Sequence, residues 1–246
     1  MGAPSVVGDV VVDVVVFQYE VPAVSAVGAA VGHHHAALPA FMGLIGQTMG
    51  LAATVDTGDH LGDAHVGHGS VSPMRVVTGS ARGRTILAPP GTAVRPTTDR
   101  VREAIFNALG SLGLVEEAVV VDLFAGSGAL GIEALSRGAS RATFVDIDRR
   151  ALEIVQANLD RCLFGDVGRV VYSDALVALG SGVAADADLV LADPPYRFDG
   201  WDGLFAAVTS PWLVAESDRA VVVGPNWEAV RTKAYGSTVV TVARRV

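Results

Sequence analysis

Cysteine is nearly absent from this chain, since Cys162 is the only one among 246 residues. A single thiol cannot form an internal disulfide, and no second thiol is present to help bind a metal ion. This usage is typical of proteins from a reducing compartment. We therefore expect a cytoplasmic protein that needs no metal, and we interpret Cys162 as an ordinary thiol near a helix end rather than a nucleophile.

Long apolar runs are also missing, although 50% of the residues are apolar. No stretch of about eighteen apolar residues is free of charges, glycine clusters or histidine, so no membrane span is expected. The N-terminus lacks the basic segment that begins a secretory signal. The length is sufficient for one large hydrophobic core or two small ones, and we expect a folded, soluble protein.

Basic residues are absent from residues 1–73, which contain six acids and all six histidines. The histidines are irregularly spaced among Gly, Ala and Val, and no Cys or carboxylate pattern accompanies them, which disfavours a metal-binding tract. We expect this segment to be an extension that is disordered or foreign to the natural protein. The other 20 of the 26 acids stand against all 18 basic residues, so the net charge of −8 arises mainly in the extension.

Regular periodicity begins at Met74. Two short β-type runs, 75–78 and 84–87, flank a Gly/Ser turn and predict a hairpin. In "RPTTDRVREAIFNALG" the apolar residues recur at helical spacing, after suitable N-cap residues and before Gly110. We therefore predict a hairpin and a helix over residues 74–110.

Arginines are concentrated in this N-terminal region. Residues 74–103 contain six of them against two acids. Arginine on a hairpin and an adjacent helix can hold RNA phosphates. A solvated charged surface explains the same composition equally well. The candidate RNA contacts are Arg82, Arg84, Arg95 and Arg100.

Strands and helices alternate in the rest of the chain. Runs that predict strands lie at 118–124, 141–147, 169–174, 188–193 and 219–224. Helical patterns at 129–137 and 149–159 separate the first three. This alternation predicts an α/β fold in which a parallel sheet is covered by helices on both faces. The tail, 234–245, is expected to add one antiparallel strand.

A glycine-rich turn follows the first of these strands, in "DLFAGSGALG". Gly126, Gly128 and Gly131 fit the G-x-G-x-x-G pattern, and Asp146 follows Gly126 by twenty residues, at the end of the next strand. A ligand can approach the backbone of Gly126, Ser127 and Gly128, and the carboxylate can accept both hydroxyls of a ribose. The pattern predicts a nucleoside cofactor and leaves a nicotinamide dinucleotide and S-adenosylmethionine open.

Acids at other strand ends favour S-adenosylmethionine. Asp122 precedes the turn, where it would repel a pyrophosphate but can hold the methionine end of the cofactor. Asp174 follows the third strand and is placed to accept a hydrogen bond from the adenine amine. Each acid alone can equally be a surface residue or a helix cap. The hypothesis therefore depends on their occurrence together at successive strand ends.

The fourth strand ends in "DPPY", at 193–196, which resembles the (D/N)PP(Y/F) motif of amino-group methyltransferases. The resemblance implies that Asp193 and the carbonyl of Pro194 accept hydrogen bonds from the target amine, in a direction that the prolines fix. It also implies that Tyr196 stacks on the base, a contact that contributes about 1–3 kcal/mol. An ordinary proline-kinked turn is the alternative.

In chain order, "MRVVTGSARGR", "RPTTDRVREAIFN", "DLFAGSGALGIEALSRGA" and "DPPY" resemble the RsmD family of 16S rRNA guanine-N2 methyltransferases. The resemblance implies a Rossmann-like class I methyltransferase with a mostly parallel seven-stranded sheet over residues 74–246. It further implies S-adenosylmethionine as donor and one guanine of 16S rRNA as acceptor, in free rRNA or in an assembling small ribosomal subunit. The segment "RPTTDRVRE" would cap the cofactor and substrate cleft. We expect a monomer.

One departure from the family and two rival functions accompany this interpretation. The family's acid after the fifth strand is missing from the predicted strand 219–224, although "KAYG", at 233–236, fits the family's closing Lys-x-Tyr-Gly pattern. Another amino-methyltransferase, acting on adenine, cytosine or a protein glutamine, is one rival. The other is an NAD-dependent oxidoreductase, which would leave "DPPY" unexplained and lacks an evident catalytic His, Lys or Tyr pair.

Overall fold

The computed structural model describes residues 74–88 and 96–246. The expectation for residues 1–73 lies outside the described residues, as does the candidate RNA contact Arg95. Within the described ranges, no helix combines the length and the apolar character that a membrane crossing requires.

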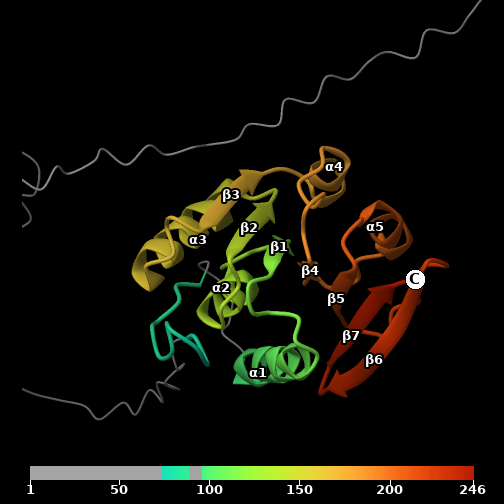
Figure 1. Ribbon diagram of the computed structural model, residues 1–246, viewed down its shortest axis with the longest axis horizontal. Coiled ribbons are helices and arrows are strands. Elements are labelled where there is room, and N and C mark those ends of the chain that lie inside the picture. Colours follow the sequence, from blue (N-terminus) through green and yellow to red (C-terminus); the bar gives the residue numbers. More distant parts are fainter. Residues whose placement is uncertain (1–73, 89–95) are drawn as a thin grey trace, which may run out of the picture. The chain divides into compact units, whose positions relative to one another are not determined.

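The described residues form one seven-stranded sheet in the order β3-β2-β1-β4-β5-β7-β6 (Figure 1). The strands β1 to β5 pair in parallel, and β7 pairs antiparallel with both β5 and β6. The predicted α/β class with a mostly parallel sheet is confirmed. The strands are β1 Val119–Leu123, β2 Arg141–Asp146, β3 Gly168–Tyr172, β4 Leu189–Ala192, β5 Trp212–Ser217, β6 Trp227–Tyr235 and β7 Thr238–Arg245.

Helices cover both faces of this sheet (Figure 1). One hydrophobic cluster joins α1, α2 and α3 to one face, and a second joins α4 and α5 to the other. Neighbouring residues of β1 divide between the clusters, since Val120 belongs to the first and Val121 to the second, as the two-residue period of a strand requires. The helices are α1 Pro96–Ser111, α2 Ala129–Ser136, α3 Arg149–Cys162, α4 Ala175–Gly180 and α5 Trp201–Ala207.

The fifth strand was predicted in the wrong place. The valine run at 219–224 forms no strand, and Val222 is 81% exposed. The strand is β5, seven residues earlier, in "WLVAES". It contains only three consecutive buried residues and two polar ones, so its apolar signal is weaker than that of the exposed valine run.

The two ends of the described fold also differ from the prediction. The tail is a hairpin of β6 and β7, because β6 is an edge strand with a single buried residue and shows no apolar alternation. At the N-terminal end, the predicted arms 75–78 and 84–87 pair through one antiparallel bridge, between Arg75 and Thr85, and through backbone hydrogen bonds from Val76 to Arg84 and from Ile86 to Met74, without forming regular strands. Side chains of α2 and α3 add further hydrogen bonds to this segment, as described below.

Candidate cofactor and acceptor site

Acids lie at the carboxyl ends of four adjacent strands. Asp146 ends β2, Asp122 lies near the end of β1, and Asp193 directly follows β4. Glu216, which was not predicted, lies at the end of β5. In the sheet order β3-β2-β1-β4-β5, the direction in which successive strands are added reverses between the neighbours β1 and β4. Ligands of open α/β folds bind at this switch point.

The glycine-rich loop is hydrogen-bonded to the first of these acids. The backbone N–H of Gly126 donates to Asp146 Oδ2 at 2.8 Å, and the N–H of Asp148 donates to Oδ1 at 2.9 Å. Gly128, the N-cap of α2, has φ 76°, a left-handed conformation that favours glycine. The predicted loop, Gly126-Ser127-Gly128, therefore lies beside a carboxylate whose direction two backbone donors fix.

The third glycine of the fingerprint has a packing role. A Cβ atom on Gly131 would come within 2.3 Å of the Phe144 ring on β2, so α2 can approach the sheet only because this side chain is missing. The N–H of Gly131 donates to Asp122 Oδ2 at 2.9 Å. The loop is thus fastened to β1 as well as to β2.

Asp122 is buried, and its carboxyl group is partly occupied by this contact with Gly131. Burial raises its pKa well above the ordinary value, the hydrogen bond from Gly131 opposes the rise, and the charges of Asp193 and Asp146 add to it. Its other oxygen accepts no hydrogen bond from the described part of the chain. The binding of the methionine end of the cofactor by Asp122 stays a prediction.

Asp174 is an exposed N-cap residue of α4. Its Oδ1 accepts hydrogen bonds from the N–H groups of Leu176 and Val177, at 2.9 and 3.2 Å. Asp174 is therefore a helix cap, which is one of the alternatives that the sequence allowed. Its contact with adenine stays a prediction, for which the second oxygen has no competing partner among the described residues.

The "DPPY" segment forms a turn that packs against the glycine-rich loop. The N–H of Phe198 donates to the carbonyl of Pro195 at 3.2 Å. The Phe198 ring lies edge-on to Phe124, with centroids 5.3 Å apart, and Phe124 is in the loop after β1. A second edge contact joins Phe198 to Trp201 of α5 at 5.2 Å. Aromatic contacts therefore hold the turn beside the predicted cofactor loop.

Asp193 and Tyr196 differ in environment. Asp193 is exposed as a residue, yet desolvation by the surrounding protein raises the pKa of its carboxyl group to about 6. Tyr196 is 57% exposed, and its hydroxyl lies 3.5 Å from Oγ of Ser237 in the β6–β7 turn. Pro194, between them, is buried. The two predicted catalytic side chains thus lie on one short turn at the end of β4.

Glu216 is the site residue that the sequence prediction missed. The register pairs Ala192 of β4 with Ala215 of β5. Asp193 directly follows the first of these residues and Glu216 directly follows the second, so the two acids occupy corresponding positions at the ends of neighbouring strands. Burial raises the pKa of Glu216 to about 8, the charge of Asp193 contributes in the same direction, and Arg102 opposes it. The prediction that the fifth strand is not followed by an acid was therefore wrong, because the strand was predicted at 219–224 and lies at Trp212–Ser217.

A buried carboxylate on α2 anchors the N-terminal segment. Glu133 Oε2 accepts the N–H of Val77 at 2.8 Å, and Oε1 accepts the N–H of Thr78 at 3.0 Å. The same carboxylate pairs with Arg137 at 2.7 Å and lies 3.6 Å from Nε of Arg102 on α1. One side chain thereby connects the segment, α1 and α2.

Asn158 on α3 joins the N-terminal segment to the cofactor loop. Its Oδ1 accepts the N–H of Leu87 at 2.8 Å, and its Nδ2 donates to the carbonyls of Leu87 and Ser127 at 3.0 and 2.9 Å. Asn158 is wholly buried. The end of the segment at Leu87 is therefore fixed beside Ser127.

The described candidate RNA contacts are not equivalent. Arg82 and Arg100 are exposed, on the N-terminal segment and on α1. Arg84 is half-buried, and its guanidinium donates to the carbonyl of Arg161 at 2.8 Å. Among the described residues, no cluster of three or more His, Cys, Asp or Glu side chains is arranged to hold a metal ion.

Comparison with known proteins places this arrangement in a family. The model of the family "Conserved hypothetical protein 95" matches residues 74–244. YlbH of Bacillus subtilis is 37% identical over 185 residues, which cover 70% of this chain and 99% of YlbH. The "Ribosomal RNA small subunit methyltransferase D" of Escherichia coli is 41% identical over 130 residues, which cover 53% of this chain and 64% of that protein.

A solved structure agrees with these relatives. The structure of yhhF from Escherichia coli has a TM-score of 0.60 and 34% sequence identity, and the match covers 70% of this chain and 98% of that one.

Proposed function

We propose that this chain, which belongs to the conserved hypothetical protein 95 family, methylates the N2 amine of a guanine in small-subunit rRNA. The chain is a methyltransferase with the class I fold and uses S-adenosylmethionine. The name of the Escherichia coli relative, a ribosomal RNA small subunit methyltransferase, supports rRNA as the substrate. The choice of guanine N2 comes from the resemblance to the RsmD family and from "DPPY". A cytoplasmic location and action as a monomer complete the proposal.

The observation that carries the proposal is the position of Asp193 beside the glycine-rich loop. The turn that bears Asp193 is packed on Phe124 through Phe198, so an acceptor for an amine proton lies next to a loop suited to a nucleoside. A desolvated carboxyl group whose pKa is raised to about 6 is typical of residues that take part in proton transfer.

The residues present fit S-adenosylmethionine. Asp146, oriented by two N–H groups, would accept the ribose hydroxyls, and the backbone of Gly126, Ser127 and Gly128 would lie against the cofactor. Asp122 would hold its methionine end and Asp174 its adenine amine. When bound, S-adenosylmethionine supplies a methyl group on a sulfonium, which is already a strong electrophile.

The protein's own contribution to the reaction is positioning and proton acceptance. A guanine unstacked from the RNA would lie on Tyr196, with its N2 amine directed toward Asp193 and the carbonyl of Pro194. As the N2–CH3 bond forms and the S–CH3 bond breaks, one N2 proton passes to the ionised Asp193 carboxylate. Since the electrophile is preformed, holding the amine in line is the main requirement.

Transfer of labelled methyl groups tests this function. The purified full chain is incubated with labelled S-adenosylmethionine and with 16S rRNA from cells that lack the activity, either free or in partly assembled small subunits. We expect the label in N2-methylguanosine after digestion and mass spectrometry, and a much lower rate of labelling with Asp193→Ala. Label in adenosine, cytidine or protein would identify the rival acceptors. Calorimetric binding of NAD instead of S-adenosylmethionine would favour the oxidoreductase.

A further inference from the structure

We propose that Arg231, Lys233 and Tyr235 on β6, here called the β6 basic face, bind the phosphate backbone of the RNA strand that carries the acceptor base. The inference rests on the proposed function and assigns to the RNA a contact surface outside the strand-end site. None of the predicted RNA contacts lies on this strand.

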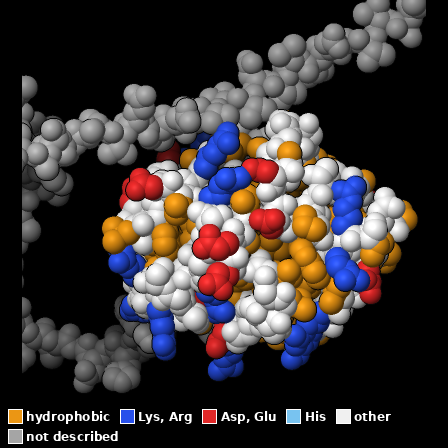
Figure 2. Space-filling view, viewed as in Figure 1, with side chains coloured by type: hydrophobic (Ala, Val, Ile, Leu, Met, Phe, Trp, Pro, Cys, Tyr) orange, Lys and Arg blue, Asp and Glu red, His pale blue; other side chains and the backbone are white. Residues whose placement is uncertain are grey.

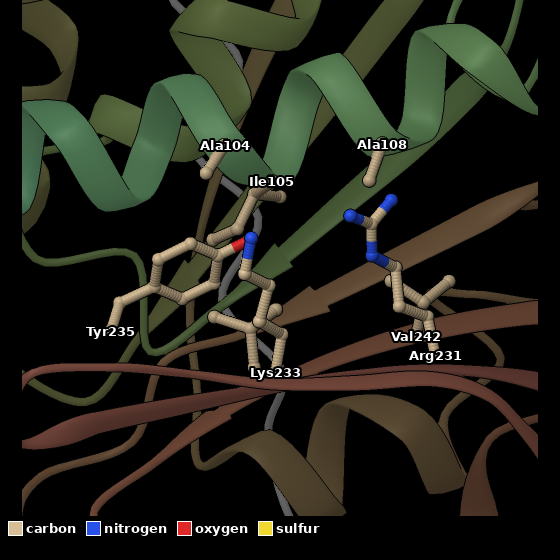
Figure 3. Close-up of a pocket in the computed structure, with 8 residues that line it drawn as sticks. Ala104, Ile105, Ala108, Arg231, Lys233, Tyr235 and Val242 are labelled. Carbon is tan, nitrogen blue, oxygen red and sulfur yellow. The ribbon is translucent and has the colours of Figure 1, made fainter.

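The three side chains project to one side of an edge strand. β6 pairs only with β7, and residues 231, 233 and 235 share a side because side chains alternate along a strand. Together with Ala104, Ile105 and Ala108 of α1 they line a shallow pocket (Figure 3). Figure 3 shows the side chains of Arg231 and Lys233 directed toward the helix. The result is a strip with an apolar wall on one side and two cations on the other.

The two cations are not engaged by acids. Arg231 and Lys233 are exposed, and within the described ranges neither side chain forms an ion pair or a hydrogen bond. Some exposed arginines of the fold, namely Arg141, Arg219 and Arg244, pair with a carboxylate and are therefore partly neutralised. A cation without an internal partner keeps its full charge for an external anion, and RNA phosphates are the anions that the proposed substrate offers.

Tyr235 orients one of the two cations. The ammonium of Lys233 lies 5.2 Å from the centroid of the Tyr235 ring, a cation–π contact that restricts where the ammonium points. The ring is half-buried against α1. This contact gives a role to the closing Lys-x-Tyr-Gly motif, 233–236, which the strand-end chemistry does not use.

The strip is continuous with the acceptor site. Directly after Tyr235 the chain turns through Gly236, whose φ is 62°, to Ser237, and Oγ of Ser237 lies 3.5 Å from the hydroxyl of Tyr196. Arg231 and Lys233 are two residues apart on an extended strand, or roughly 7 Å. A nucleotide strand whose target base lies on Tyr196 can therefore continue along β6 with successive phosphates beside the two cations.

The surface charge on this side of the fold agrees with the assignment. In Figure 2, Lys and Arg side chains are prominent along the lower margin, over the region that α1 and β6 occupy in Figure 1. Exposed Arg100 lies on the same helix α1 that forms the other wall of the strip. The RNA path thus runs between a predicted contact on α1 and the β6 basic face.

A double substitution tests the inference. In the full chain, Arg231→Ala with Lys233→Ala is compared with Arg169→Ala, which removes an exposed arginine from β3, the opposite edge strand. Affinity for a 16S rRNA fragment is measured over a range of KCl concentrations, together with the single-turnover rate at saturating RNA and the affinity for S-adenosylmethionine.

We expect the double variant to bind the RNA at least about tenfold more weakly at moderate salt, and the slope of log affinity against log salt to fall by about 2. Cofactor affinity and the saturated rate should not change, Arg169→Ala should behave as wild type, and Lys233→Arg should retain binding. An unchanged RNA affinity and salt slope in the double variant overturns the inference, as does loss of binding in Lys233→Arg. If the wild type does not methylate rRNA at all, the proposed function has failed instead.

Discussion

The acids at the strand ends of the two halves of the sheet differ in their hydrogen bonding and in their pKa values. On the β1–β2 side, Asp146 accepts two backbone hydrogen bonds and Asp122 accepts one. On the β4–β5 side, Asp193 and Glu216 accept none from the described part of the chain, and their pKa values are raised to about 6 and 8. The first pair belongs to the fixed frame of the glycine-rich loop. The second pair is desolvated, and under the proposed function Asp193 would obtain its partner when the substrate amine enters.

This contrast fits an enzyme that binds the same cofactor in every reaction and must also accept a proton from the reacting amine. A cofactor that is always the same is best met by groups whose direction is set before it binds, which lowers the entropy lost on binding. A reacting amine needs an acceptor whose proton affinity can change during the reaction, and desolvated carboxyl groups supply this. Substitutions on the two sides should therefore damage different steps.

Asp193→Ala should show the largest effect and should act on turnover alone. Loss of one oriented acceptor in a desolvated site costs about 2.7–4 kcal/mol of barrier, by analogy with the loss of an oxyanion-hole donor, or a fall of roughly 100- to 1000-fold. Affinity for S-adenosylmethionine should stay within about twofold of wild type. Steady-state methyl transfer and calorimetry measure the two quantities.

The control is Asp199→Ala, six residues further along the same segment. Asp199 is exposed and pairs with Arg219 at 2.6 Å, a surface contact whose loss should leave turnover unchanged. Near-normal turnover in Asp193→Ala would remove Asp193 from the chemistry and, with it, the contrast between the two halves.

Asp146→Ala should show the opposite pattern. Charge-assisted hydrogen bonds contribute about 1.5–3 kcal/mol each, so loss of the ribose contact should weaken binding of S-adenosylmethionine roughly 10- to 100-fold. At saturating cofactor, turnover should recover most of its wild-type value. Asp186→Ala, an exposed acid that pairs with Arg141, is the matched control. Equal cofactor affinity in wild type and Asp146→Ala would place the ribose elsewhere.

Glu216→Gln should change stability in a pH-dependent way. The pKa of Glu216 is raised from 4.5 to about 8, so between these values the folded protein keeps a proton that the unfolded chain releases. The wild type therefore loses stability as the pH rises through this window, and the uncharged Gln variant does not. At pH 8.5 the variant should be more stable by on the order of 1–3 kcal/mol, and at pH 4 the difference should disappear.

Urea unfolding at the two pH values measures this difference. Glu228→Gln, which removes an exposed glutamate paired with Arg244 on the neighbouring strand, is the control and should show little pH-dependent gain. A gain for Glu216→Gln that is equal at both pH values would show that packing, and not the ionisation of Glu216, causes it.

The sequence predicts what depends on local pattern. The glycine-rich loop, the acids at 122 and 146, and "DPPY" are recognisable because each is a short segment in which strand, turn and functional residue follow one another directly. The helix α1 was predictable from its apolar period, although it begins at Pro96, before the expected cap residues 97–99, and ends at Ser111, one residue past the expected stop. These elements account for the fold class and for most of the candidate site.

The residues that were missed act through contacts distant in sequence. Glu133 and Asn158 look like ordinary polar residues of two helices, yet they bind a segment 55 and 71 residues earlier, and the sequence contains no sign of this pairing. Glu216 was missed because an exposed valine run gave a stronger apolar signal than the true strand, β5. Proline at 211 followed by the apolar residues 213–215 was the signal that could have located it.

The smallest effect is expected on the acceptor side, from Tyr196→Phe. Stacking on a base uses the face of the ring and contributes about 1–3 kcal/mol, whereas the hydroxyl of Tyr196 lies at a long 3.5 Å from Oγ of Ser237 at an exposed position. Tyr196→Phe should therefore change kcat/KM by less than about twofold, and Ser237→Ala should match it. Tyr196→Ala should raise KM for the RNA clearly more than either, with cofactor affinity unchanged. A large loss in Tyr196→Phe would mean that the hydroxyl, and not the ring, contacts the substrate, and that the acceptor side recognises its base by hydrogen bonds at Tyr196 as well as at Asp193.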